Sequence, residues 1–146
     1  MSLNYFEKNL LVDLENKISS SELHILGSSE PYFLKLEQHY PVKHNRIDWD
    51  RLQVVEKNYE GNSNKQLKGF IEFFTLITEK YYLSEDLIWI GDSAINFAIT
   101  GSVEVIMSCL NYILDIPQHH YFLSTDYKWC FCFTFEGEMF FGTQPD

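Results

Sequence analysis

Basic side chains are scarce in the second half of this 146-residue chain. Residues 83–146 hold nine acidic side chains and a single base, Lys128, whereas residues 1–82 hold twelve acids and ten bases. The net charge of −10 therefore divides into −8 and −2. Such a field repels phosphate backbones and anionic lipid headgroups, and it speeds the approach of cations. We therefore expect no nucleic-acid or membrane partner, and we expect a basic protein as the partner.

Motifs of the common enzyme classes are absent as well. The chain has no Gly-x-Ser-x-Gly, no glycine-rich phosphate loop, no Gly-x-Gly-x-x-Gly and no His-Glu-x-x-His. Closely spaced carboxylates such as Asp48 and Asp50 arise by chance in an acidic chain and usually mark a solvated face. We therefore expect a protein that is not an enzyme and that uses no cofactor.

Cysteine is also rare, and two of the three cysteines, Cys130 and Cys132, lie two residues apart. On a strand this spacing puts both side chains on one face but too far apart for an unstrained disulfide. Free thiols in a reducing compartment are the simpler explanation. The sequence has no apolar run of about 18 residues, and its first residues lack the pattern of a secretory signal. We expect a soluble, cytoplasmic protein.

Aromatic residues are abundant, at 16% of the chain. Each buried aromatic side chain removes roughly 150–250 Å² from water. A chain of this length can therefore build one dense core without disulfides. No internal repeat, linker or low-complexity tract divides the sequence, so we expect a single domain over residues 1–146.

Apolar residues at steps of three and four predict the helices. The first helix begins with a capping box of Asn4 and Glu7. Ser63 and Ser102 are the predicted caps of two later helices. The segment 31–40 fits either a strand or a short helix. The predicted helices cover residues 4–18, 48–58, 63–82 and 103–114.

Short apolar segments bounded by turn residues predict the strands. Strands that follow helices and are joined by short turns indicate an α+β fold with a mainly antiparallel sheet. We expect about five to six strands, mostly in C-terminal hairpins, packed against three to four helices. The predicted strands cover residues 22–27, 87–90, 94–100, 119–124, 128–135 and 138–142.

Turn lengths predict the register of the last three strands. A two-residue turn pairs Phe133 with Phe140, and an even-length turn before it pairs Phe122 with Trp129. Both faces are then largely apolar, so one should lie under helices, while the other is covered by more helices or forms a binding or dimer surface. One predicted face carries His120, Phe122, Trp129, Phe131, Phe133, Phe135 and Phe140, and the other carries His119, Tyr121, Cys130, Cys132, Thr134, Met139 and Phe141.

Carboxylates surround the aromatic residues of these strands in the sequence. An apolar anchor with an acidic rim is the arrangement that captures a basic protein quickly and selectively. The predicted contact residues are Asp92, Asp126, Tyr127, Trp129, Glu136 and Glu138.

Two other functions are compatible with the same strands. In the predicted register His119, Cys130 and Cys132 share a face, and three nitrogen and sulfur ligands with an open position resemble a catalytic zinc site. Spacing places no fourth ligand, and a Cys-x-Cys in an aromatic strand is more often packed thiol than ligand. His119 also suits a general base in a small hydrolase. A homodimer built on the spare sheet face is the third interpretation.

The run from residue 119 to 142 resembles the closing hairpins of small bacterial immunity proteins that neutralise polymorphic or contact-dependent toxins. It has a Tyr-Phe-x-Ser strand from Tyr121, an aspartate turn at Asp126, an apolar strand led by Trp129 and a short glycine turn at Gly137. One group of these proteins, the SUKH group, carries Pro-x-x-Tyr and Asn-Gly-Gly landmarks that this sequence lacks. The resemblance implies stoichiometric inhibition of a cognate toxin, often a nuclease.

Overall fold

The computed structural model describes residues 2–53 and 55–145 and has an α+β fold. In these residues the main sheet has seven strands in the order β1-β6-β5-β7-β8-β9-β4, and every neighbouring pair is antiparallel. The short strands β2 and β3 form a separate hairpin. The strands are β1 (Leu23–Ser28), β2 (Val42–Lys43), β3 (Arg46–Ile47), β4 (Val55–Tyr59), β5 (Asp86–Gly91), β6 (Phe97–Ser102), β7 (His120–Ser124), β8 (Trp129–Phe133) and β9 (Glu138–Thr143).

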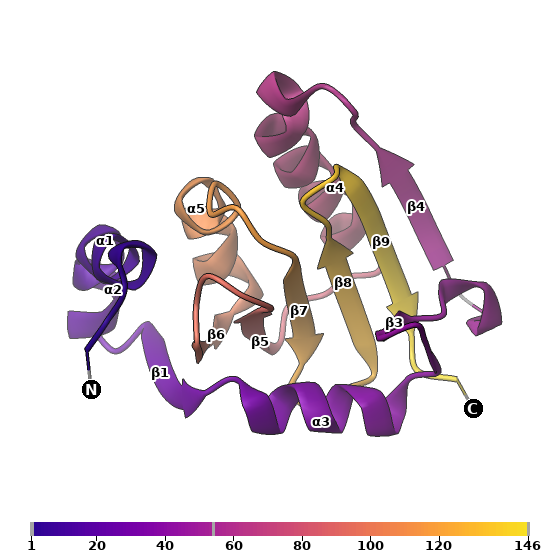
Figure 1. Cartoon of the computed structure of the whole chain (residues 1–146), viewed down its shortest axis with the longest axis horizontal. Helices are drawn as coiled ribbons and strands as arrows, with labels where there is room; N and C mark the ends of the chain where they lie inside the picture. The colour runs from indigo at the N-terminus through magenta and orange to yellow at the C-terminus, as the bar shows by residue number, and fades with distance from the viewer. Residues whose placement is uncertain (1, 54, 146) are drawn as a thin grey trace.

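Helices lie on both sides of this sheet. Figure 1 shows α3 towards the viewer, along the lower ends of β7 and β8, and α4 farther back, behind β8 and β9. In the described part of the chain, no helix is both long enough and apolar enough to cross a membrane. The helices are α1 (Tyr5–Asp13), α2 (Glu15–Ser19), α3 (Glu30–His39), α4 (Gln66–Lys80) and α5 (Val103–Ile113), with 3-10 turns η1 (Trp49–Arg51) and η2 (Ser63–Lys65).

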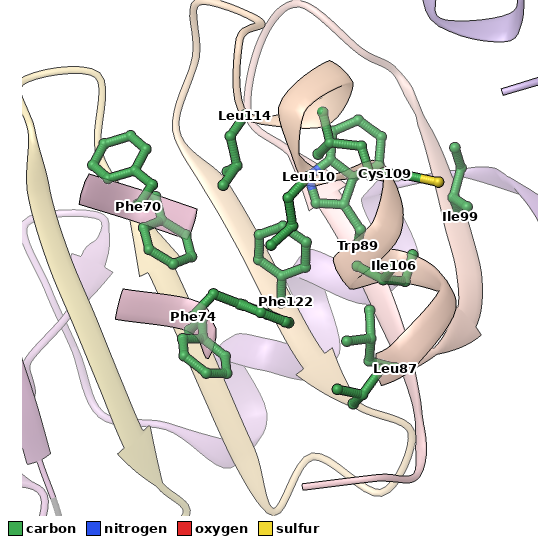
Figure 2. Close-up of a cluster of buried hydrophobic side chains, with 14 of the residues drawn as sticks. Phe70, Phe74, Leu87, Trp89, Ile99, Ile106, Cys109, Leu110, Leu114 and Phe122 are labelled. Carbon is green, nitrogen blue, oxygen red and sulfur yellow. The ribbon is translucent and has the colours of Figure 1, made fainter. Parts of the chain in front are cut away.

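The first face of the sheet is buried under α1, α4 and α5. The ring of Phe74 on α4 lies 4.7 Å from the ring of Phe131 and 5.3 Å from that of Phe122, between centroids. Figure 2 shows Trp89 of β5 and Leu110 of α5 in the same buried cluster. Each such ring removes roughly 150–250 Å² from water. This face is therefore the main core, and it is closed to partners.

The second face is only partly covered, by α3, η1 and the β2–β3 hairpin. Leu36 of α3, Tyr40 just after α3 and Trp49 of η1 join Tyr121 and Cys130 in a second, smaller buried cluster. The sequence left open whether helices or a partner cover this face. One helix and a hairpin cover part of it, and a groove remains beside them.

Local capping was largely predictable. Asn4 accepts a hydrogen bond from the Glu7 amide at 2.8 Å, and Glu7 accepts one from the Asn4 amide at 3.1 Å, which is the predicted capping box. The predicted helix over 4–18 breaks at Leu14 into α1 and α2. The predicted cap Ser102 accepts from the Val105 amide at the start of α5. The segment 31–40 is helical, as α3.

Two predicted helix starts are wrong. The helix after Ser63 begins only at Gln66, because η2 precedes it and the side chain of Asn62 caps that turn. In the described part of the segment 48–58, residues 49–51 form η1 and residues 55–58 belong to β4 on the edge of the sheet, in place of the predicted helix. The spacing of Trp49, Leu52 and Val55 suits a helix, but the open edge of β9 offers backbone hydrogen bonds that outweigh this local preference.

The turn between β8 and β9 has three residues, and the predicted two-residue turn is wrong. The Thr134 amide donates to the Glu138 carbonyl at 2.9 Å, and Gly137 adopts a φ of 100°. A glycine in the left-handed region at the end of a three-residue loop is a common hairpin solution. Phe133 therefore lies opposite Met139, one residue away from the predicted pairing.

This shift by one residue exchanges the two faces of β9. Met139 and Phe141 point into the main core, and Phe140 points to the second face. The register of the β7–β8 hairpin also differs from the prediction, here by two residues. Phe122 lies opposite Phe131, where Trp129 was predicted. A shift by two keeps every side chain on its face, so the predicted faces of β7 and β8 hold.

Candidate functional site

A groove lies between the second face of the sheet, α3 and the β2–β3 hairpin. It consists of two adjoining hollows, of about 420 and 520 Å³, and we call the pair the hairpin groove. Arg46, His119 and Tyr121 line both hollows. Volumes of this size fall in the range of ligand and peptide sites.

The floor of the hairpin groove is aromatic. Phe33 meets Tyr121 edge to face at 5.5 Å, and Trp49 stacks on Phe140 at 5.0 Å with the planes only 5° apart. These rings come from α3, η1 and two strands of the sheet, so the floor exists only in the folded chain. It offers apolar surface and ring faces to an incoming side chain.

The β2–β3 hairpin forms one wall of this groove. His44 and Asn45 both have positive φ, at 53° and 64°, between the paired residues Lys43 and Arg46. Two consecutive positive φ values define the tight two-residue turn whose twist suits a hairpin. The turn places the Arg46 guanidinium over the start of β7, where its Nη2 lies 3.1 Å from His119 Nε2.

His119 is the centre of the polar contacts. Its amide donates to Asp92 Oδ1 at 3.0 Å, and its Nδ1 accepts a hydrogen bond from the Phe135 amide at 2.9 Å. The Glu136 carboxylate lies 3.9 Å from the same Nδ1. Through its backbone amide and its imidazole together, His119 therefore joins the end of β5 to the β8–β9 turn.

The β8–β9 turn and the end of β4 form an exposed surface beside the groove. Phe135 is 61% exposed at the tip of the turn, and Tyr59 is 64% exposed at the end of β4. Glu136 borders a hollow with Tyr59 on one side and a second hollow with Asp92 and Phe135 on the other. Glu138 pairs with Tyr59 across the strands. We call Tyr59, Asp92, Phe135, Glu136 and Glu138 the end surface.

The turn that carries Glu136 depends on Gly137. A β-carbon at Gly137 would lie 2.1 Å from the carbonyl oxygen of Glu60, and the φ of 100° also disfavours any other residue. The Glu60 amide donates to the Gly137 carbonyl at 3.0 Å. The end of β4 and the β8–β9 turn are therefore held together. The backbone hydrogen bond of Glu136, and then the nearby His119 and Arg46, hold the pKa of the Glu136 carboxyl below its usual value.

The six predicted contact residues do not share one surface. Asp92, Glu136 and Glu138 come together around His119, as the acidic-rim hypothesis requires. Asp126 lies in the β7–β8 turn, at the opposite end of the strands, because β7 begins beside Gly91 and ends beside Leu87. The predicted grouping of Asp126 with the other carboxylates is therefore wrong.

Tyr127 and Trp129 are buried at 5% exposure each, so neither presents its ring to a partner. The Tyr127 ring stacks on His39 at 5.0 Å. Trp129 packs in the main core, and its indole nitrogen donates to Glu85. The strand position of Trp129 was predictable and Tyr127 lies in the β7–β8 turn, but the burial of both rings depends on α3 and α4, which the strand pattern does not place.

The predicted metal ligands are separated as well. Cys132 lies opposite Tyr121 and Cys130 opposite Leu123, so His119 lies beyond the paired residues of β7. Burial raises the pKa of the Cys130 thiol and raises that of Cys132 to about 12. In the metal-free protein both sulfurs are therefore protonated thiols at neutral pH. Across residues 2–53 and 55–145, no three His, Cys, Asp or Glu side chains are grouped to hold a metal ion.

Sequence reasoning missed Arg46, Phe135 and Tyr59. Arg46 was not among the predicted contact residues, although the His44-Asn45 pair before it is a usable turn signal. Phe135 was assigned to a sheet face because the turn was taken one residue too short. Tyr59 was placed just beyond a predicted helix that is a strand.

Comparison with known protein families found no match, and no characterised protein is similar enough in sequence to count as a relative. The function is therefore inferred from the geometry of the hairpin groove and the end surface.

Proposed function

We propose that this protein is a non-enzymatic immunity protein, which neutralises a basic toxin by binding it one to one through the end surface. The observation that carries the proposal is the grouping of two exposed aromatic rings, Phe135 and Tyr59, with Asp92, Glu136 and Glu138. The whole molecule has a net charge of −10. Exposed rings act as apolar anchors, and the carboxylates around them form an acidic rim.

The two kinds of residue have separate roles in this proposal. Carboxylates on a rim mainly raise the association rate by attracting a cationic partner before contact. An aromatic side chain that becomes buried in the complex mainly slows dissociation. A toxin that acts on nucleic acid must itself carry a basic face. An acidic surface of this kind would cover such a face.

The family resemblance supports the same location. The strands and turns from residue 119 to 142, which resemble the closing hairpins of immunity proteins, supply Phe135, Glu136 and Glu138 of the end surface. The protein would act by occupying its target, so the surface needs no catalytic group.

The test uses the product of the reading frame beside this protein's gene as the partner, measured by stopped-flow fluorescence. We expect a one-to-one complex whose association rate falls as salt rises from low to physiological concentration. The double variant Glu136→Gln/Glu138→Gln should lower the association rate by about threefold to tenfold. Asp126→Asn is the control for the loss of one charge and is compared with Glu136→Gln alone, because Asp126 lies at the opposite end of the strands.

Phe135→Ala should raise the dissociation rate by about tenfold or more with little effect on association, as expected for a central aromatic anchor. If neither variant changed the rates, or if Asp126→Asn had the larger effect, the end surface would be the wrong site. An association rate independent of salt would contradict electrostatic steering. Sedimentation of the protein alone at micromolar concentration tests the competing homodimer interpretation.

A further inference from the structure

We propose that Arg46 occupies a cation subsite at the mouth of the hairpin groove, and that an arginine of the basic partner displaces it on binding. The subsite is formed by His119, Glu136 and Glu138, which lie where the groove meets the end surface. This inference rests on the proposed function, because it specifies which group of a basic partner is recognised.

The ion pairs of Arg46 are loose. Its Nη2 lies 3.9 Å from Glu136 Oε1, and its Nη1 lies 3.8 Å from Glu138 Oε1. Both distances exceed the range of a nitrogen–oxygen hydrogen bond. All three side chains are between 40% and 56% exposed, so the pairs are screened and weak. Arg46 therefore partly neutralises the two carboxylates without using their hydrogen-bonding capacity.

The contact of Arg46 with His119 is also unfavourable in the neutral ring. Nδ1 of His119 accepts from the Phe135 amide, so the ring hydrogen resides on Nε2. Nε2 then faces Arg46 Nη2 at 3.1 Å, which brings two hydrogen-bond donors together. A guanidinium that entered from outside could instead approach the carboxylates directly and leave Nε2 free to donate.

The position of Arg46 on the β2–β3 hairpin allows its side chain to be displaced. Arg46 is on the β2–β3 hairpin, which in the described part of the chain forms a two-stranded sheet separate from the seven-stranded one. The aromatic floor beside it, with Tyr121 and Phe140, suits the methylene stem and planar head of an arginine. Displacement would uncover Glu136 and Glu138 next to Asp92, which leaves a strongly acidic site for the incoming cation.

The test measures binding of a defined probe, the acetylated and amidated peptide Gly-Arg-Gly-Arg-Gly, by two-dimensional amide NMR at low salt. The amide signal of Phe135 is the local reporter, because that amide bonds His119. Arg46→Ala should bind the peptide about threefold to tenfold more tightly than the wild type, because two half-exposed ion pairs no longer compete. The peptide with lysine in place of arginine should gain less.

Lys43→Ala is the matched control. Lys43 is on the same hairpin, lines the same groove and carries the same charge, but it is not part of the subsite. A general effect of net charge would appear equally in Lys43→Ala and Arg46→Ala, and that outcome would overturn the inference. Shifts outside the groove and the end surface would overturn it too.

The partner used to test the proposed function separates the two failures. If Glu136→Gln/Glu138→Gln slows association but Arg46→Ala behaves like Lys43→Ala, the proposed function stands and the subsite fails. If the peptide binds as expected but the double variant leaves association with the neighbouring gene product unchanged, the subsite stands and the proposed function fails.

Discussion

His120 should make this protein less stable in mild acid. Its imidazole is fully buried at the start of β7 and has a partner for each nitrogen. Trp89 Nε1 donates to Nδ1 at 3.2 Å, and Nε2 lies 2.9 Å from the Ile116 carbonyl, to which it donates. Both bonds are satisfied by the neutral ring. Protonation would place a hydrogen on Nδ1 against the indole N–H and would bury a charge.

Burial lowers the pKa of His120 from 6.5 to about 4, and the nearby His119 lowers it slightly further. The hydrogen bond to Ile116 and the charge of Asp92 raise this pKa, but by less than burial lowers it. Below pH 6.5 the unfolded chain takes up a proton at this residue that the folded chain refuses until about pH 4. The stabilisation is therefore complete above pH 6.5 and is lost as the pH falls towards 4. At pH 5 the loss is about 2 kcal/mol, because each pKa unit corresponds to about 1.4 kcal/mol.

The assay is urea unfolding followed by tryptophan fluorescence at pH 7.5 and pH 5.0, on the wild type and on His120→Gln. Glutamine can accept from Trp89 and donate to Ile116 but does not titrate. We expect the variant to be less stable at pH 7.5 by about 1–3 kcal/mol and to lose about 2 kcal/mol less than the wild type on going to pH 5.0.

His24→Gln, at an exposed position of β1, controls for the removal of a histidine and should change the pH dependence less. Carboxylates with lowered pKa values, such as Glu56 and Glu136, also lose stabilisation in acid, but they are common to all three proteins. Parallel losses in the wild type and His120→Gln would refute the reasoning, as would direct NMR titration of His120 near pH 6.5.

Two further substitutions test how the scaffold is held. Gln118→Ala should lower the free energy of unfolding by about 1–3 kcal/mol in urea, because the buried Gln118 Oε1 accepts from the amides of Ser93, Ala94 and Ile95; a loss below about 0.5 kcal/mol would mean that these amides find other partners. Asn4→Ala should cost about 1 kcal/mol by removing the capping box and the bond from Asn4 Nδ2 to the Ala94 carbonyl, whereas Asn4→Asp keeps the capping oxygen and should cost less. Equal losses in the two Asn4 variants would exclude the cap as the cause.

Short-range features were readable from the sequence. The capping box of Asn4 and Glu7 and the Ser102 cap involve residues three apart, so their physics is contained in the local sequence. The α+β class and the strand positions from β5 to β9 followed from apolar patterning for the same reason.

Register depended on one residue of turn length. Whether β8 turns in two residues or three decides which side of β9 meets the core, and the glycine at 137 permits either. The shape of the core settles it, because Met139 and Phe141 pack against α4 and the neighbouring strands. Because the turn is one residue longer than predicted, Phe135 lies at its tip with an exposed ring, which the sequence did not predict. The carboxylates of Glu136 and Glu138 were predicted contact residues and do lie at the end surface.

The acidic field, the aromatic core-forming strands and the local caps can be read from the sequence, because each depends on composition or on residues a few positions apart. Long-range packing makes 55–59 a strand, buries Tyr127 and Trp129, and brings Arg46 to His119 across 73 positions of sequence. These outcomes depend on which free edge, helix or hairpin comes to lie against each segment. That choice is made by packing over the whole chain.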